Sequence, residues 1–210
     1  MQRIVLQRIV PVAVVDDPED AVPLAEALVA GGLSLIEVTL RTPVAVECIA
    51  RIRQALPTML VGAGTVLDAH QVQPALDAGA QFGVAPGLNE TVVLKARDLG
   101  LPFVPGVMTP SEVERALGFG CKLLKFFPAE AAGGVPMLRA LAGPYLHTGV
   151  KFVPLGGIGP ANAADYLKLP LVAAVGGTWL VERRLVAERD WARITALTRE
   201  AVALVAKTAL

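Results

Sequence analysis

The chain has 210 residues, 54% of them hydrophobic and 18% charged, so it can bury a substantial core and is not expected to be disordered. Nineteen basic and nineteen acidic residues cancel, which removes the electrostatic argument for nucleic acid or an anionic membrane as a partner. No apolar run approaches the roughly 18 residues of a membrane-spanning helix, and the N-terminus lacks a signal-peptide pattern, so we expect a cytoplasmic protein.

Short apolar runs rich in β-formers alternate with stretches of helical character along the whole chain. The predicted strands are residues 9–15, 33–40, 59–63, 82–85, 103–105, 123–127, 152–155 and 172–175. The predicted helices are residues 18–30, 43–55, 69–78, 90–99, 110–117, 136–141, 160–167 and 190–207. Several helices begin with proline and are followed by glycine, which is the usual punctuation of helix ends.

Eight strand–helix units with nearly continuous apolar strands indicate a parallel sheet that is buried on both faces. That pattern predicts an α/β fold of the single (β/α)8 (TIM) barrel type, at the compact end of its size range. The alternative is an open, doubly wound sheet. No linker or internal repeat suggests a second domain, so residues 1–210 are interpreted as one barrel domain.

Lys125 is the most informative residue, because it interrupts an apolar run that otherwise has the character of a buried strand. Full burial lowers a lysine pKa by as much as about 3–5 units, and a neutral amine is the nucleophile of a Schiff-base enzyme. The alternative is a strand-end lysine whose stem covers apolar surface while its head reaches water. The remaining lysines lie on helices or precede strands, so Lys125 is the candidate nucleophile.

Glu37 lies in the predicted strand of residues 33–40, where alternation places it and Thr39 on the barrel side of the sheet. A carboxylate there is costly unless it is paired, and Lys125 is the obvious partner. The pair is either a catalytic arrangement or a buried ion pair without chemistry.

Polar and small residues follow the next strand ends, where the active site of such a barrel lies. Arg41 is placed to hold an anionic group by a bidentate contact, although an ordinary exposed loop arginine is the alternative. Thr65 can donate to a carboxylate, and Pro86 closes the fourth strand. The glycines near Thr65 do not form a dinucleotide-binding fingerprint.

Glycine pairs follow the last two predicted strands, at the usual phosphate-binding position of this fold. The first pair is Gly156-Gly157 and the second is Gly176-Gly177, which Thr178 follows. Both pairs together favour a phosphate site over plain turns. No basic side chain is evident there, so main-chain N–H groups and Thr178 would carry the binding.

The chain has two cysteines and two histidines. The cysteines lack metal-ligand spacing and are expected to be buried free thiols. So few histidines argue against a histidine-centred metal site and against a serine–histidine triad, so no metal and no dissociable cofactor are predicted.

Taken together, these segments resemble the bacterial 2-keto-3-deoxy-6-phosphogluconate (KDPG) aldolase family, also known for 4-hydroxy-2-oxoglutarate (KHG) cleavage. The resemblance runs nearly end to end. The segments that carry it are Glu-Val-Thr-Leu-Arg-Thr (37–42), Gly-Ala-Gly-Thr-Val-Leu (62–67), Pro-Gly-Leu (86–88), Lys-Phe-Phe-Pro-Ala-Glu (125–130) and Gly-Gly-Thr-Trp-Leu (176–180).

The resemblance implies a metal-independent class I aldolase on a homotrimeric barrel, acting on pyruvate and a 2-keto-3-deoxy phospho sugar acid. It implies that Lys125 is the Schiff-base lysine and Glu37 the general acid/base. The implied substrate contacts are Arg41 and Thr65 at the pyruvate carboxylate, Pro86 and Phe127, and Gly156, Gly157, Gly176 and Thr178 at the phosphate.

Two positions depart from the family pattern. Thr178 stands where many members carry serine, which keeps the hydroxyl. Leu155 stands where many carry threonine, which removes a polar contact near the substrate hydroxyls, so we predict a relaxed preference between C4 epimers. Left open are KHG as the preferred substrate, another phosphate-binding barrel enzyme, and a sugar-phosphate sensor without turnover. A metal-dependent aldolase is disfavoured by the scarcity of histidine.

Overall fold

The computed structural model describes residues 2–208, in which nine strand segments alternate with α-helices. The strands are β1 (Ile9–Ala13), β2 (Leu35–Thr39), β3 (Leu60–Gly64), β4 (Phe82–Val84), β5 (Phe103–Val104), β6 (Gly106–Val107), β7 (Leu123–Phe126), β8 (Lys151–Pro154) and β9 (Val175–Gly177). The α-helices are α1 (Gln2–Gln7), α2 (Ala21–Ala30), α3 (Ala45–Ala55), α4 (Val72–Asp77), α5 (Glu90–Asp98), α6 (Pro110–Gly118), α7 (Gly134–Ala142), α8 (Ala163–Leu167), α9 (Arg183–Ala187) and α10 (Trp191–Thr208). Three 3-10 turns complete the chain: η1 (Pro18–Asp20), η2 (Ala69–Gln71) and η3 (Gly143–Thr148).

The strands pair in parallel around a closed ring. One sheet has the order β5-β4-β3-β2-β1-β9 and the other β6-β7-β8. β5 and β6 are two halves of one strand interrupted at Pro105, which has no N–H for the ladder. A parallel bridge between Phe152 and Val172 joins β8 to the segment that leads into β9. The ring therefore has the eight strands of the predicted (β/α)8 barrel.

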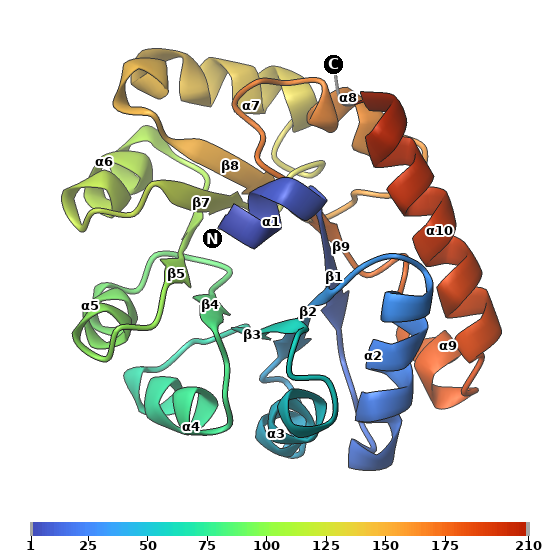
Figure 1. Ribbon diagram of the computed structural model, residues 1–210. Helices are drawn as coiled ribbons and strands as arrows, with labels where there is room; N and C mark the ends of the chain where they lie inside the picture. Colours follow the sequence, from blue (N-terminus) through green and yellow to red (C-terminus); the bar gives the residue numbers. More distant parts are fainter. Residues whose placement is uncertain (1, 209–210) are drawn as a thin grey trace.

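The helices form an outer layer around this ring, as Figure 1 shows in a view along the barrel. The main hydrophobic core lies between the strands and these helices, where Ile36 and Val38 of β2 pack with Leu24, Leu28 and Ile49 of the helices. The opposite residues of the strands form a second cluster inside the barrel. This division follows from the alternation of side chains along each strand.

Helix α1 closes the N-terminal end of the barrel (Figure 1). Its residue Ile4 is 2% exposed and belongs to the interior cluster with Val10, Phe82, Val104 and Val153. The barrel interior at this end is therefore packed mainly with apolar side chains, whereas Glu37, Thr39 and Lys125 lie toward the C-terminal ends of the strands.

Most of the predicted elements are confirmed with shifts of a few residues at their ends. The sequence analysis missed α1 and α9, which the structure forms at Gln2–Gln7 and Arg183–Ala187. The strand predicted at residues 172–175 makes only a bridge at Val172 and forms its ladder with β1 from Val175 onward. The strand predicted at residues 103–105 continues beyond Pro105, and the predicted open sheet alternative is excluded by the closed ring.

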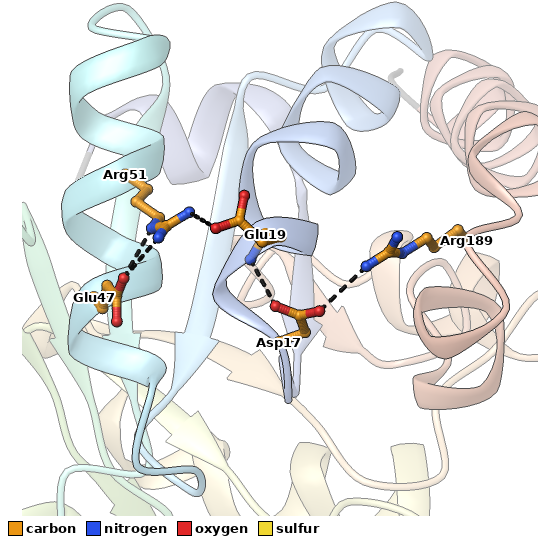
Figure 2. A network of polar contacts seen from close by, with 5 residues as sticks. All are labelled: Asp17, Glu19, Glu47, Arg51 and Arg189. Atoms are coloured by element: carbon orange, nitrogen blue, oxygen red, sulfur yellow. Dashed lines mark hydrogen bonds and ion pairs between the residues drawn. The ribbon is translucent and has the colours of Figure 1, made fainter.

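An ion-pair network holds η1, which follows β1, between two helical regions (Figure 2). Arg51 of α3 contacts Glu19 at 2.7 Å and Glu47 at 2.8 Å. On the other side, Arg189 reaches Asp17 at 3.2 Å. Exposed pairs of this kind contribute little stability each, so the network mainly fixes the position of the loop that follows β1.

Among residues 2–208, no helix combines the length and the apolar character that crossing a bilayer requires.

Candidate active site

A cavity of about 330 Å³ opens at the C-terminal ends of the strands. Its walls come from strand ends and loops that are far apart in the sequence. The lining residues are Val12, Glu37, Thr39, Arg41, Thr65, Pro86, Lys125, Phe127, Leu155, Gly156, Gly157, Ile158, Gly177 and Thr178. The cavity thus contains every site residue predicted from the sequence except Gly176, and its size suits a small substrate.

β2 carries Glu37 and Thr39 into the barrel, as the alternation predicted. The Thr39 hydroxyl donates to the Ala13 carbonyl at 2.9 Å, which joins the ends of β1 and β2. Glu37 lies across Gly64 of the neighbouring β3, so closely that a Cβ at Gly64 would collide with its carboxylate. The glycine therefore makes the space that the carboxylate occupies.

Glu37 is the one acidic residue of the cavity lining, and it is 1% exposed. Within residues 2–208, its buried Oε1 atom has no hydrogen-bond partner. Burial raises the pKa of Glu37 above its ordinary value, and the positive charge of Lys125 offsets part of that rise. A carboxyl group with a raised pKa keeps its proton at pH values where an exposed glutamate has lost it, which suits a group that donates and accepts protons.

Lys125 of β7 is 5% exposed and also faces the cavity. Its Nζ atom lies 5.1 Å from the centroid of the Phe127 ring, a cation–π contact that partly replaces lost hydration. No ion pair joins Lys125 to Glu37 directly among the described residues, although the charge of Lys125 still acts on the pKa of Glu37. An amine and a carboxyl group thus face one small cavity without neutralising each other directly.

Arg41 and Thr65 lie on the rim that follows β2 and β3. Arg41 is exposed and, in the part of the chain that the structure describes, forms no ion pair. Thr65 has a φ of +56°, which is unfavourable for a β-branched residue. Strain of this kind persists where surrounding structure imposes it and clusters at functional sites. Both residues line the cavity that Lys125 also faces.

The opposite wall is the turn of Gly156 and Gly157, with φ values of +95° and +79°. Such left-handed turns of main chain point successive N–H groups outward and form sites for anions. Helix α8 begins only at Ala163, five residues after Ile158, so the turn itself is not part of a helix N-terminus. Arg41 and Lys125 are the cationic side chains of the lining.

The comparison with known proteins matches this chain to one family. The family model described as "Aldolase: KDPG and KHG aldolase" matches residues 1–197. A 2-dehydro-3-deoxy-phosphogluconate aldolase of Treponema pallidum is 49% identical over 94% of this chain and 93% of its own, and a KHG/KDPG aldolase of Escherichia coli K12 is 50% identical over 92% and 90%.

The chain belongs to the KDPG and KHG aldolase family. It is therefore an aldolase, a carbon–carbon lyase. The structure of a KDPG aldolase of Legionella pneumophila, with pyruvate captured as a covalent carbinolamine, superimposes with a TM-score of 0.90 at 43% identity, covering 96% of this chain and 98% of the other.

One glycine predicted in the site of this aldolase lies just outside the cavity. Gly176 is covered by Leu155, and a Cβ at Gly176 would lie 2.6 Å from the Leu155 Cγ atom. Gly177 lines the cavity in its place. The sequence analysis saw the glycine pair but had no signal for which of the two faced the substrate, because the register of β9 depends on its pairing with β1.

Three other residues line the cavity of this aldolase but were not predicted from the sequence as site residues. Val12 lies in an apolar run that suggests only core packing, and Ile158 stands among glycines without a polar group of its own. Thr39 was predicted to face inward but was given no role in the site. Strand alternation from Glu37 was the one signal available for Thr39. The cysteines lie outside the cavity, and burial raises the pKa of Cys48 to about 11 and also raises that of Cys121, so neither is an activated nucleophile.

Proposed function

We propose that this aldolase cleaves KDPG to pyruvate and glyceraldehyde 3-phosphate through a Schiff base on Lys125. The single observation that carries the proposal is the buried amine of Lys125 facing the unpartnered carboxyl group of Glu37 across one cavity. The name of the Treponema relative and the covalent pyruvate adduct of the Legionella protein support the same substrate and chemistry.

In this mechanism the neutral amine of Lys125 attacks the C2 ketone and forms a carbinolamine, which loses water to give an iminium ion. The iminium ion accepts the electron pair of the C3–C4 bond when that bond breaks. Glu37 accepts the proton of the C4 hydroxyl and assists the dehydration, directly or through a water. The resulting enamine is protonated at C3, and hydrolysis releases pyruvate and restores the lysine.

The two ends of the substrate carry negative charge, and the cavity offers different groups to each. Arg41 and Thr65 are assigned to the carboxylate of the pyruvate half, with Pro86 and Phe127 packing against it. The phosphate is assigned to the N–H groups of the Gly156–Gly157 turn and to Thr178. This division places C2 beside Lys125 and the distal end against the glycines.

KHG is a second candidate substrate, because the Escherichia coli relative carries both names. It presents a carboxylate where KDPG presents the phosphate, so one set of main-chain donors serves both. The relative kcat/KM of the two compounds decides between them. We also propose that residues 1–210 act as one catalytic domain and that the protein is a homotrimer, for which light scattering should give three times the mass of the chain.

The direct test is pyruvate release from KDPG by the wild type and by Lys125→Arg. The substitution keeps the charge and most of the volume but removes the nucleophile, so we expect kcat to fall on the order of 10⁴-fold or more. Lys122→Arg, on the exposed segment just before β7, is the matched control and should retain full activity. Equal activity of the Lys125 variant and the wild type would contradict the proposed function.

A further inference from the structure

A tyrosine–glutamate pair lies directly behind the Gly156–Gly157 turn, outside the cavity. Tyr166 of α8 is 1% exposed, and its hydroxyl donates a hydrogen bond to Oε1 of Glu130, in the loop after β7. Neither residue lines the cavity. The mechanism described above gives this pair no role.

The turn is held by Glu130 on one side and by Asn162 on the other. The Glu130 N–H donates to the Gly156 carbonyl at 3.0 Å, and Asn162 Nδ2 donates to the Gly157 carbonyl at 3.0 Å. The stem of Glu130 lies over Gly157, where an added Cβ would be 2.7 Å from its Cβ and Cγ atoms. Both glycine carbonyls are therefore occupied by hydrogen bonds within the protein.

The N–H groups of the same two glycines remain without an acceptor inside the described part of the chain. Their direction is set by the positive φ angles of +95° and +79°, which in turn depend on how the carbonyls are held. Glu130 is the residue that touches the turn through both its main chain and its stem. Tyr166 fixes the free end of that side chain.

We propose that Tyr166 and Glu130 are positioning residues that aim the Gly156–Gly157 N–H groups at the phosphate of the substrate. This inference rests on the proposed function, in which that turn receives the phosphate. Loss of the tyrosine hydroxyl releases the Glu130 side chain, and the turn then samples orientations that bind the phosphate less well. The pyruvate half of the site, on the other side of the cavity, does not depend on the pair.

The test is Tyr166→Phe, which removes one hydroxyl and keeps the ring. We expect the KM for KDPG to rise on the order of tenfold, which lies in the range for loss of a hydrogen bond to a charged group, with kcat changed by less than about threefold. The half-saturating concentration of pyruvate in borohydride trapping should stay at the wild-type value, because pyruvate has no phosphate.

The chain offers a close control, because its only other tyrosine also donates to a glutamate. The Tyr145 hydroxyl donates to Glu114 at 3.0 Å, away from the cavity. Tyr145→Phe should change neither the KM for KDPG nor the half-saturating concentration of pyruvate. Glu130→Gln keeps an acceptor for Tyr166 and should stay near the wild type, whereas Glu130→Ala should reproduce the effect of Tyr166→Phe.

Two outcomes would overturn the inference. One is an unchanged KM for KDPG in both Tyr166→Phe and Glu130→Ala. The Glu130 variant alters an exposed residue, so it tests the same hydrogen bond even if the tyrosine variant folds poorly. The other is a parallel rise for KDPG and pyruvate, which indicates general damage to the site. A wild-type protein that releases no pyruvate from KDPG would instead refute the proposed function, so the two failures are distinguishable.

Discussion

The two ends of the barrel interior are filled by opposite kinds of side chain. At the N-terminal end, Ile4 of α1 packs against Val10, Phe82 and other apolar residues of the strands. At the C-terminal end, Glu37 and Lys125 are also deeply buried, yet within residues 2–208 one Glu37 oxygen has no hydrogen-bond partner. The floor therefore contributes stability by burying apolar surface, whereas the mouth holds polar groups at a cost in stability and keeps them available for chemistry.

After the substitution of Lys125 itself, the largest effect is expected from Glu37→Gln at the mouth. Glutamine has nearly the same shape but accepts no proton, so we expect kcat for KDPG cleavage to fall by about 10²–10⁴-fold. Steady-state pyruvate release measures this change, and Glu26→Gln on the exposed face of α2 serves as the control. A loss of less than about tenfold would mean that another group transfers the proton.

At the N-terminal end of the barrel, Ile4→Ala should lower the stability of the protein and leave its activity unchanged. Removal of a buried isoleucine side chain costs about 2–5 kcal/mol of unfolding free energy, while kcat at a temperature where the variant is folded stays at the wild-type value. Leu6→Ala, on the same helix but 78% exposed, is the control and should change little. Urea unfolding measures both variants, and equal stability of the two would show that α1 does not seal the floor.

The loss of stability caused by burying Glu37 at the mouth should appear in the dependence of the unfolding free energy on pH. Burial raises the pKa of Glu37 above the ordinary glutamate value of 4.5, so the folded protein keeps this proton at pH values where the unfolded chain has lost it. Stability then falls as pH rises from about 4.5 through the raised pKa. We expect Glu37→Gln to gain unfolding free energy relative to the wild type across that range, as measured by urea unfolding at a series of pH values. A difference that is constant with pH would contradict this assignment.

The smallest effect concerns Leu155, which borders both the mouth and the apolar interior. An apolar residue there distinguishes hydroxyl configurations poorly, so the kcat/KM ratio between the C4 epimers of the substrate should be below about a thousandfold. Leu155→Thr supplies a hydroxyl and should raise the ratio, whereas Leu146→Thr, on an exposed turn, should not. A wild-type ratio above that value would remove Leu155 as the cause of relaxed selectivity.

Local sequence patterns were sufficient to predict the barrel fold and the inward direction of Glu37. Alternation along a strand, and proline or glycine at helix ends, are properties of residues that are close together in the sequence. They were not sufficient for α1, whose six residues have the same mixture of apolar and polar side chains as a short strand. Its position depends on contacts with strands far away in the chain. The same holds for the choice of Gly177 over Gly176. It also holds for the absence of a direct ion pair between Glu37 and Lys125, whose strands β2 and β7 are not neighbours in the ring.

The most direct test of the central claim is borohydride reduction in the presence of saturating pyruvate, followed by intact mass measurement and peptide mapping. The account predicts one reduced pyruvyl adduct per chain, located on Lys125 and absent from Lys125→Arg. An unmodified protein, or an adduct on a different lysine, would contradict the assignment of Lys125 as the Schiff-base nucleophile.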